Sequence, residues 1–206
     1  MRYAALVALM ALLLAGVLIN LRFTREEHNA PYAPMRVDNF PRMVENLSML
    51  QKPFSLSSEA FQPSGPIPTR YTCDGEEVSP PLSIVGTPSD TRSMVLIVED
   101  PDVPKALKPD GLFLHWLLFN IPPAVTELPE GASIGIHGAN GAGQTSYVGP
   151  CPPARYEPRS HRYVFTIYAL DSMLDLQEGA TKEEVMNAML GHVISETRLV
   201  GTYARP

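Results

Sequence analysis

The chain has 206 residues, enough for one domain of ordinary size plus an extension. A hydrophobic content of 45% and a charged content of 18% are those of a globular protein with a real core, and 21 prolines favour short strands and turns over long helices. The net charge of -6, without a cluster of Lys and Arg, argues against a nucleic-acid-binding surface.

Residues 1–22 have the pattern of a membrane anchor. The uninterrupted apolar run from Ala4 to Ile19 would rise about 24 Å as a helix, and its flanking residues bring it near the roughly 30 Å thickness of the bilayer's hydrocarbon layer. No small-x-small cleavage site follows, so we expect a retained transmembrane helix, with a secreted protein after signal cleavage as the alternative. Charge does not fix the orientation, because Arg2 and the charged amino terminus are balanced by Arg22 and Arg25. A short N-terminal run usually leaves the amino terminus in the cytoplasm, which would place the domain outside.

Residues 23–51 are charged and contain prolines, which is typical of a linker, and a short helix is expected near Pro41. The folded domain is expected over residues 52–206. Its predicted strands are Phe54 to Phe61, the Leu82 segment, Met94 to Val98, Leu112 to Ile121, the run from Tyr163, and Leu199 to Arg205. One helix is predicted from Thr181 to Val193, where Glu184 completes a capping box with Thr181. Together these elements predict a mostly β, antiparallel sandwich with a few peripheral helices.

The most specific chemistry lies on the strand pair around residue 100. Asp100 and Asp102 follow the end of the first strand, where prolines fix the backbone. His115 falls inside the second strand. Strict alternation would place it on one face with Phe113, Leu117 and Phe119, and would place Trp116 on the other face with Leu114 and Leu118. A histidine on an apolar face costs free energy unless its ring nitrogens are paired, and the two carboxylates are the nearest partners.

A second histidine lies in a similar context, on an apolar strand that follows a proline-containing loop. The proline-rich loop Tyr147 to Pro153 leads to His161, which stands at the start of another apolar strand with Tyr163. Taken alone, each histidine is most simply explained as a structural core residue. Two such residues, each beside a rigid proline loop, favour a shared site.

Four motifs in a fixed order resemble the phosphatidylethanolamine-binding protein family, in its bacterial and archaeal branch related to Raf kinase inhibitor proteins. The motifs are EDPDVP, HWLLFNIP, YVGPCPP and HRYVFTIYALD, with IPTRYTCDGEEVSPPL before them and VGTYAR at the end. The resemblance covers about residues 54–205. It implies a Greek-key-type β fold with one ligand pocket at its edge, and no required metal or cofactor.

Carried over position by position, the resemblance implies a set of ligand-binding residues. They are Asp100, Asp102, His115, Gly149, Pro152, His161 and Tyr163. A protonated histidine, a phenol and backbone N–H groups would suit a phosphate group, and the two aspartates would orient the imidazoles. Cys151 stands where other members of the family have glycine. It and Cys73 are the chain's two cysteines, and a disulfide between them is chemically permitted outside the cytoplasm.

Other chemistries have weaker signals. Gly131 to Gly135 spells G-x-S-x-G, but Ser133 lacks the preceding strand and following helix of a nucleophile elbow. The glycine-rich stretch Gly138 to Gly143, within the loop Gly135 to Thr145, is not followed by a helix that could hold phosphates, so a mobile surface loop is expected. The aspartates and histidines do not have a tight metal-ligand spacing.

Three functions stay open from the sequence. The first is a non-enzymatic protein that binds phosphorylated small molecules or phospholipid head groups. The second is an interaction protein that inhibits a protease or modulates a kinase, which the resemblance also allows. The third is a hydrolase.

Overall fold

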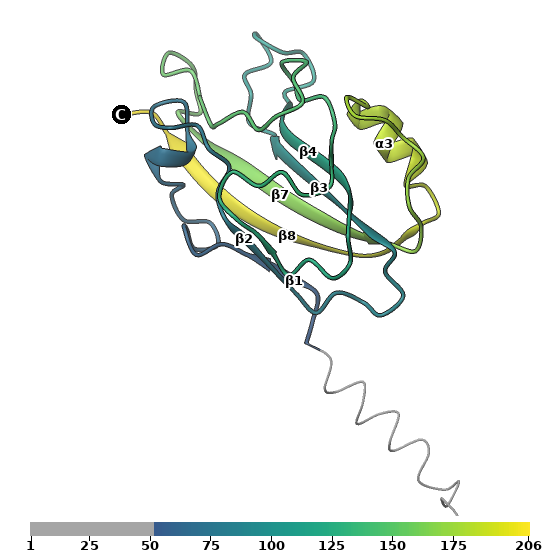
Figure 1. The fold of residues 1–206 in the computed structure, drawn as a ribbon. Coiled ribbons are helices and arrows are strands. Elements are labelled where there is room, and N and C mark those ends of the chain that lie inside the picture. Colours follow the sequence, from purple (N-terminus) through teal and green to yellow (C-terminus); the bar gives the residue numbers. More distant parts are fainter. Residues whose placement is uncertain (1–51) are drawn as a thin grey trace, which may run out of the picture. The chain divides into compact units, whose positions relative to one another are not determined.

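The computed structural model describes residues 52–206, which belong to one compact unit built mainly from two antiparallel sheets (Figure 1). Its elements in chain order are β1 (Ser55–Ser57), the 3₁₀ helix η2 (Thr69–Tyr71), β2 (Leu82–Val85), β3 (Ser93–Asp100), β4 (Phe113–Ile121), β5 (Glu127–Leu128), β6 (Ile136–His137), β7 (Ser160–Leu170), α3 (Lys182–Ala188) and β8 (Val193–Ala204). The small sheet has the order β1-β2-β5 and the large sheet β6-β4-β3-β7-β8. The predicted mostly β fold is therefore confirmed.

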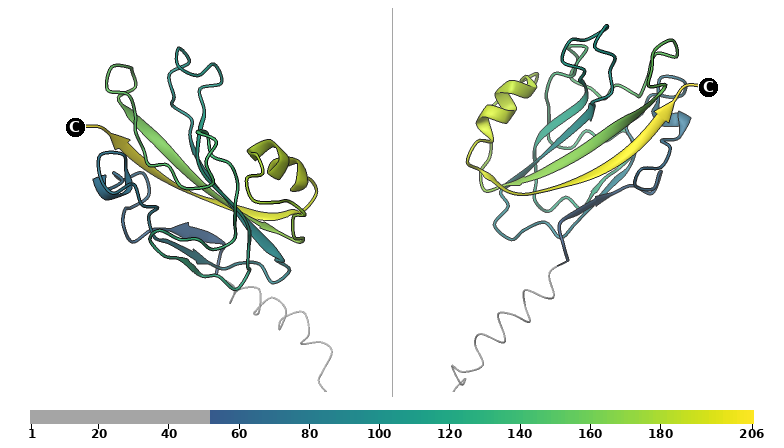
Figure 2. Two further views of the ribbon diagram at one scale, coloured as in Figure 1. Left: turned by 45° about the horizontal axis from the view of Figure 1, so that its top comes forward. Right: turned by 180° about the vertical axis from the view of Figure 1, so that it is seen from behind.

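The large sheet has the strand order of a Greek key. Strands β6, β4 and β3 lie side by side, and β7 returns by a long connection to the other edge of β3. Strand β8 then pairs along the whole length of β7, from Ser160 opposite Ala204 to Leu170 opposite Val193. Figure 2 shows these two long strands crossing the molecule in both views.

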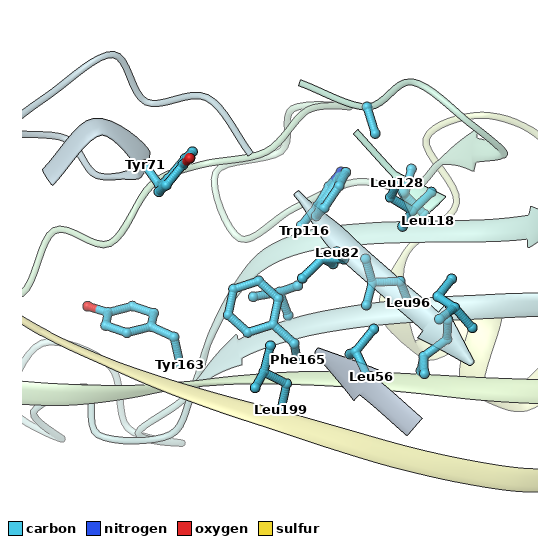
Figure 3. Packing of buried hydrophobic residues seen from close by; sticks show 14 of the residues in the cluster. Leu56, Tyr71, Leu82, Leu96, Trp116, Leu118, Leu128, Tyr163, Phe165 and Leu199 are labelled. Carbon is cyan, nitrogen blue, oxygen red and sulfur yellow. The ribbon is translucent and has the colours of Figure 1, made fainter. Parts of the chain in front are cut away.

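Both faces of the large sheet are covered, which explains why β3 is an almost continuous apolar run. One face packs on the small sheet through an intersheet core (Figure 3). This core includes Leu56, Leu82, Leu96, Trp116, Leu118, Phe165 and Leu199. The other face packs on α3 through a helix-side core. That core includes Val95, Ile97, Leu114, Leu117, Phe119, Val185 and Met189.

Helix α3 begins as the sequence predicts but ends earlier. The Thr181 side chain accepts a hydrogen bond from Glu184 N (3.2 Å), and the Glu184 carboxylate accepts one from Thr181 N (2.8 Å), which confirms the capping box. Gly191, with φ +80°, reverses the chain after the helix. Val193 then pairs with Leu170, so it belongs to β8 rather than to the predicted helix.

Several strand boundaries differ from those predicted. Strand β8 starts at Val193 rather than Leu199, because its polar first half is held by backbone pairing to β7 and not by side-chain burial. Strand β1 covers only Ser55–Ser57 of the expected run to Phe61. There the Ser58 hydroxyl donates to the Pro81 carbonyl (2.6 Å), although Phe61 is still buried in the intersheet core.

The predicted anchor over residues 1–22 and the linker over 23–51 lie outside the described residues. Within residues 52–206, no helix combines the length and the apolar composition needed to cross a bilayer. Attachment to a membrane through the apolar run Ala4 to Ile19 stays a prediction.

Candidate functional site

A cavity of about 340 Å³ opens where β3 ends, β7 begins and β4 starts. We call it the site cavity. Its lining residues are Asp100, Val103, Leu107, Phe113, His115, Val148, Gly149, Cys151, Pro152, Pro153 and His161. Five of the seven residues implied by the resemblance are in this set; Asp102 and Tyr163 are not. The lining is mostly apolar, and its polar groups are one carboxylate, two imidazoles and the backbone.

Asp100 and His161 form the buried polar pair of the cavity. His161 is 1% exposed, and its Nδ1–H donates to Asp100 Oδ2 over 2.6 Å. The other Asp100 oxygen accepts a hydrogen bond from Asp102 N (2.8 Å), which fixes the carboxylate at the end of β3. The second ring nitrogen of His161, Nε2, is buried without a hydrogen-bond partner among the described residues. One ring nitrogen therefore orients the ring, and the other makes no hydrogen bond within residues 52–206.

Asp102 does not orient an imidazole, and the prediction that it does is wrong. Its oxygens accept hydrogen bonds from Arg162 Nε (2.8 Å), Arg162 Nη2 (2.7 Å) and Arg162 N (2.9 Å). These hydrogen bonds hold the pKa of Asp102 below its usual range. Because Arg162 follows His161 in an antiparallel strand, its side chain points away from that of His161, and Asp102 turns outward with it.

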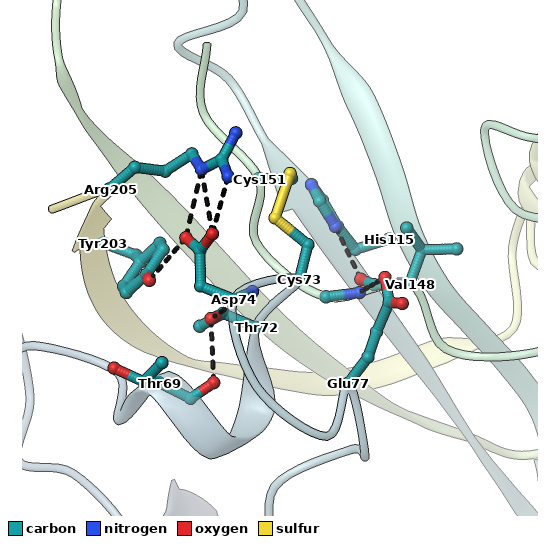
Figure 4. Close-up of a disulfide and its surroundings, with 11 residues drawn as sticks. Thr69, Thr72, Cys73, Asp74, Glu77, His115, Val148, Cys151, Tyr203 and Arg205 are labelled. Atoms are coloured by element: carbon teal, nitrogen blue, oxygen red, sulfur yellow. Dashed lines mark hydrogen bonds and ion pairs between the residues drawn. A yellow bond between two sulfur atoms is a disulfide. The ribbon is translucent and has the colours of Figure 1, made fainter. Parts of the chain in front are cut away.

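One ring nitrogen of His115 is hydrogen-bonded to the protein backbone. Its Nδ1–H donates to the Val148 carbonyl over 2.7 Å, and Val148 N donates in return to the His115 carbonyl over 2.9 Å (Figure 4). Burial lowers the pKa of His115, and the Val148 carbonyl and the Asp100 charge oppose this shift only in part. In the neutral ring, Nε2 is then a hydrogen-bond acceptor.

A β-bulge decides which way His115 points. Val98 pairs with Trp116 while Glu99 pairs with Leu114, so His115 is an extra residue in β4. The ring packs edge-on against Phe113 (4.8 Å between ring centroids) and Tyr163 (5.1 Å). A bulge of this kind redirects a side chain and shifts the alternation beyond it.

The predicted faces of β4 need correction for the same reason. Leu114 lies in the helix-side core with Leu117 and Phe119, not in the intersheet core with Trp116. His115 does not share a core with Leu117. Strict alternation fails here because the bulge adds one residue between Leu114 and Trp116.

The loop from Val148 to Pro153 forms one wall of the cavity, which we call the loop wall. Gly149 N donates to the Glu77 carboxylate (3.1 Å), so this backbone group is not free to bind a ligand as the sequence suggested. A Cβ on Gly149 would lie 2.9 Å from the Thr72 backbone, which explains why glycine is needed there. Pro152 is buried and lines the cavity. Cys151 forms a disulfide with Cys73, with Cα atoms 5.5 Å apart (Figure 4).

Tyr163 supports the site from within the core. It is 1% exposed, stacks edge-on against His115, and is not among the residues that line the cavity. Burial raises the pKa of its phenol, and the hydroxyl is buried without a partner among the described residues. Figure 3 shows the hydroxyl pointing away from the rest of the intersheet core.

The sequence predicted that the Gly149 to Pro153 loop forms a wall of the pocket, but it did not predict two other apolar lining residues. Val103 and Leu107 come from irregular segments without periodicity, and Leu107 is 52% exposed. A large aliphatic side chain isolated in a polar loop was the only available signal for Leu107. Glu77, which accepts a hydrogen bond from the loop wall, had no sequence signal.

The segment from Gly135 to Thr145 is tied to the sheet rather than free. It contains β6, which pairs with β4, and the buried Asn140 side chain accepts hydrogen bonds from Ala142 N (2.9 Å) and Gln144 N (3.0 Å). Ser133, in the G-x-S-x-G match, is exposed and lies in a loop that no helix follows. Within residues 52–206, no three His, Cys, Asp or Glu side chains cluster as metal ligands.

The family model for phosphatidylethanolamine-binding protein matches residues 57–204. A UPF0098 protein of Chlamydia trachomatis is 48% identical over 151 residues, which are 73% of this chain and 98% of the relative.

Two crystal structures are similar to the described fold. One, from Chlamydia trachomatis, is described as a homologue of phosphatidylethanolamine-binding proteins. It has 47% identity and a TM-score of 0.71, and the match covers 74% of this chain and 98% of that one. The other is YbcL of E. coli, described as a member of the mammalian family. It has 25% identity and a TM-score of 0.66, covering 75% of this chain and 100% of that one. The chain therefore belongs to the phosphatidylethanolamine-binding protein family.

Proposed function

We propose that residues 52–206 bind a phosphate-bearing small molecule or the phosphate head group of a phospholipid in the site cavity, without chemical turnover. The observation that carries this proposal is His161 Nε2, a buried polar atom without a hydrogen-bond partner among residues 52–206, on a ring that lines the cavity. Buried polar groups are almost always hydrogen-bonded, so an orphan at a cavity marks a position for a ligand atom. The family to which the chain belongs supports the same ligand class.

Binding of a phosphate here would be coupled to a proton. No Lys or Arg is among the described residues that line the cavity, so the two imidazoles are the lining side chains that could donate a hydrogen bond to a phosphate. Each imidazole already donates from Nδ1, to Asp100 or to Val148. A neutral ring can then only accept at Nε2, so a hydrogen bond to an unprotonated phosphate oxygen needs a proton on the ring. Affinity for a phosphate dianion should therefore rise as the pH falls.

Matched substitutions of three histidines by asparagine test the proposal. The Asn amide N–H can replace Nδ1–H toward Asp100 or Val148, so His161→Asn and His115→Asn should keep the fold while removing Nε2. His192→Asn is the control, because His192 is exposed and its Nδ1 bonds Asp171 (2.8 Å) after α3.

The measurement is titration calorimetry with phosphoethanolamine and with inorganic phosphate. Each cavity variant should lose about tenfold to a hundredfold in affinity, the cost of removing a charged donor to a ligand, and the control should bind as the wild type does. Repeating the titration in buffers of different ionisation enthalpy should reveal net proton uptake. Equal affinity in all four folded proteins would refute the proposal.

A phospholipid ligand and a soluble one are distinguished by flotation with vesicles that contain phosphatidylethanolamine. Vesicle binding that His161→Asn abolishes would indicate a lipid head group, and binding of phosphoethanolamine alone would indicate a soluble molecule. Release of chromophore from a chromogenic ester or phosphoester, lost in His161→Asn, would contradict the proposed lack of turnover.

A further inference from the structure

The loop wall is held at its start by several hydrogen bonds. Val148 is paired with His115 through two of them, Gly149 N donates to Glu77, and the Pro150 carbonyl accepts from Cys73 N (3.1 Å). These bonds fix the inner half of the wall against β4 and against the segment after η2.

The outer half of the loop wall, Cys151 to Pro153, has one covalent link to a distant segment, the disulfide. Pro152 and Pro153 have no N–H group, and residues 154–159 are exposed. The hydrogen bonds of this stretch are local, such as Tyr156 N to the Pro153 carbonyl (3.1 Å). In the described structure, the disulfide at Cys151 is therefore the last covalent or hydrogen-bonded link to a distant segment before β7 begins at Ser160.

The neighbours of Cys73, at the other end of the disulfide, are held by several hydrogen bonds. Thr72, beside Cys73, bonds the Thr69 carbonyl through both its N–H (3.0 Å) and its hydroxyl (2.8 Å). Asp74, on the other side, accepts from the Tyr203 hydroxyl (2.9 Å) and from Arg205 Nη2 (2.6 Å), as Figure 4 shows. Cleavage of the bridge would therefore release the Cys151 side, which carries the cavity wall, and leave the Cys73 side in place.

We propose that the Cys73–Cys151 disulfide is a redox latch on the site cavity: the closed bridge holds Cys151, Pro152 and Pro153 against the ligand, and its reduction opens the wall and weakens binding. This inference rests on the proposed function and adds its regulation. Cys151 is exposed, so a thiolate can reach the bridge. A dithiol reductant would supply two electrons and two protons. The S–S bond breaks, two protein thiols form, and the dithiol is oxidised to its own disulfide.

The test uses the full chain in its oxidised, reduced and reoxidised forms, at a temperature below the melting point of the reduced protein. Titration calorimetry with phosphoethanolamine should show affinity about tenfold weaker after reduction, because binding must then order the released wall, and full recovery on reoxidation. The Cys73→Ser/Cys151→Ser double variant should bind as weakly as the reduced protein and should not respond to the dithiol.

Hydrogen exchange gives a readout that does not need a ligand. Reduction should speed exchange at the Tyr156 amide, which donates to the Pro153 carbonyl, while the β7 and β3 amides stay protected. Unchanged exchange at Tyr156, equal affinity of folded oxidised and reduced protein, or global unfolding on reduction would each overturn the latch. Failure of the oxidised protein to bind phosphoethanolamine, with the wall still loosened by reduction, would instead refute the proposed function.

Discussion

At the scale of single residues, the two histidines and two aspartates of the site differ in what surrounds them. Asp100 and His161 are buried and bonded to each other, whereas Asp102 faces solvent-exposed Arg162. Their spacing in the sequence does not reveal this difference. The difference leads to two predictions.

The first concerns Asp100 and Asp102. Asp100→Asn would turn an amide N–H toward one of two donors, His161 Nδ1 or Asp102 N, and should cost about 1.5–3 kcal/mol of stability. Asp102→Asn breaks an exposed pair and should cost less than about 1 kcal/mol. Urea denaturation of the two variants measures both values. Ligand affinity should follow the same order, and equal losses would mean that Asp102 does contribute to the site.

The second concerns pH and stability. The pKa of His115 is lowered in the folded state by burial, so below about pH 6.5 the unfolded chain binds a proton that the folded chain does not. Stability should therefore fall as the pH falls from about 7 to 5, by up to about 1.4 kcal/mol per pH unit for this residue. Among residues 52–206, the charged or titratable groups around His115 are Asp100, His161, Glu77 and Tyr163.

The check is urea denaturation of wild type and His115→Asn across that pH range. The variant should show a shallower loss, and the difference between the two curves isolates His115. This matters because burial also lowers the pKa of His137. Parallel curves would show that His115 does not titrate differently in the two states.

At the scale of the elements, the site depends on how closely irregular segments approach the strands. The bulge in β4 directs His115 toward Tyr163, and Gly149 lets the loop wall touch the segment after η2. Neither feature follows from hydrophobic periodicity.

Gly149→Ala tests this close approach. Its Cβ would lie 2.9 Å from Thr72 backbone atoms and 3.0 Å from the Tyr71 carbonyl, so the loop wall must shift, at a cost of about 1–3 kcal/mol. The control is Gly143→Ala, in which the Cβ meets no atom within 4 Å. There only the positive φ of +76°, which is unfavourable for alanine, lowers stability, by up to about 1 kcal/mol. Thermal denaturation compares the variants. A smaller loss for Gly149→Ala than for Gly143→Ala would contradict the packing argument.

At the scale of the whole molecule, the site cavity requires the complete sandwich. Its lining comes from β3, β4, β7 and two long loops. The intersheet core draws on residues from Leu56 to Tyr203, and the helix-side core on residues from Val95 to Met189. Folding of the sheets and formation of the site are therefore one event.

A chain that starts at Lys52 should consequently unfold in one cooperative transition. Its melting temperature and its affinity for phosphoethanolamine should equal those of the full chain in detergent. Differential scanning calorimetry and titration calorimetry measure the two quantities. A lower melting temperature for the shorter chain would show that residues 1–51 pack on the domain.

The sequence by itself determined the fold class, the main strands and the helix cap. Apolar runs such as Met94 to Val98, and the capping box at Thr181, are local signals whose physical causes act within a few residues. The ordered motifs also pointed to the family and to Asp100, His115 and His161 as parts of one site.

Only the tertiary structure decided which polar atoms of the site are already hydrogen-bonded to other residues. The outward turn of Asp102, the use of Gly149 N by Glu77 and the bulge at His115 each depend on a partner far away in the sequence. Hydrogen-bond competition and close packing between distant segments are settled only when the segments meet. The composition and spacing of the residues could not show that one buried nitrogen of His161 has no hydrogen-bond partner within residues 52–206, which is the feature on which the proposed function rests.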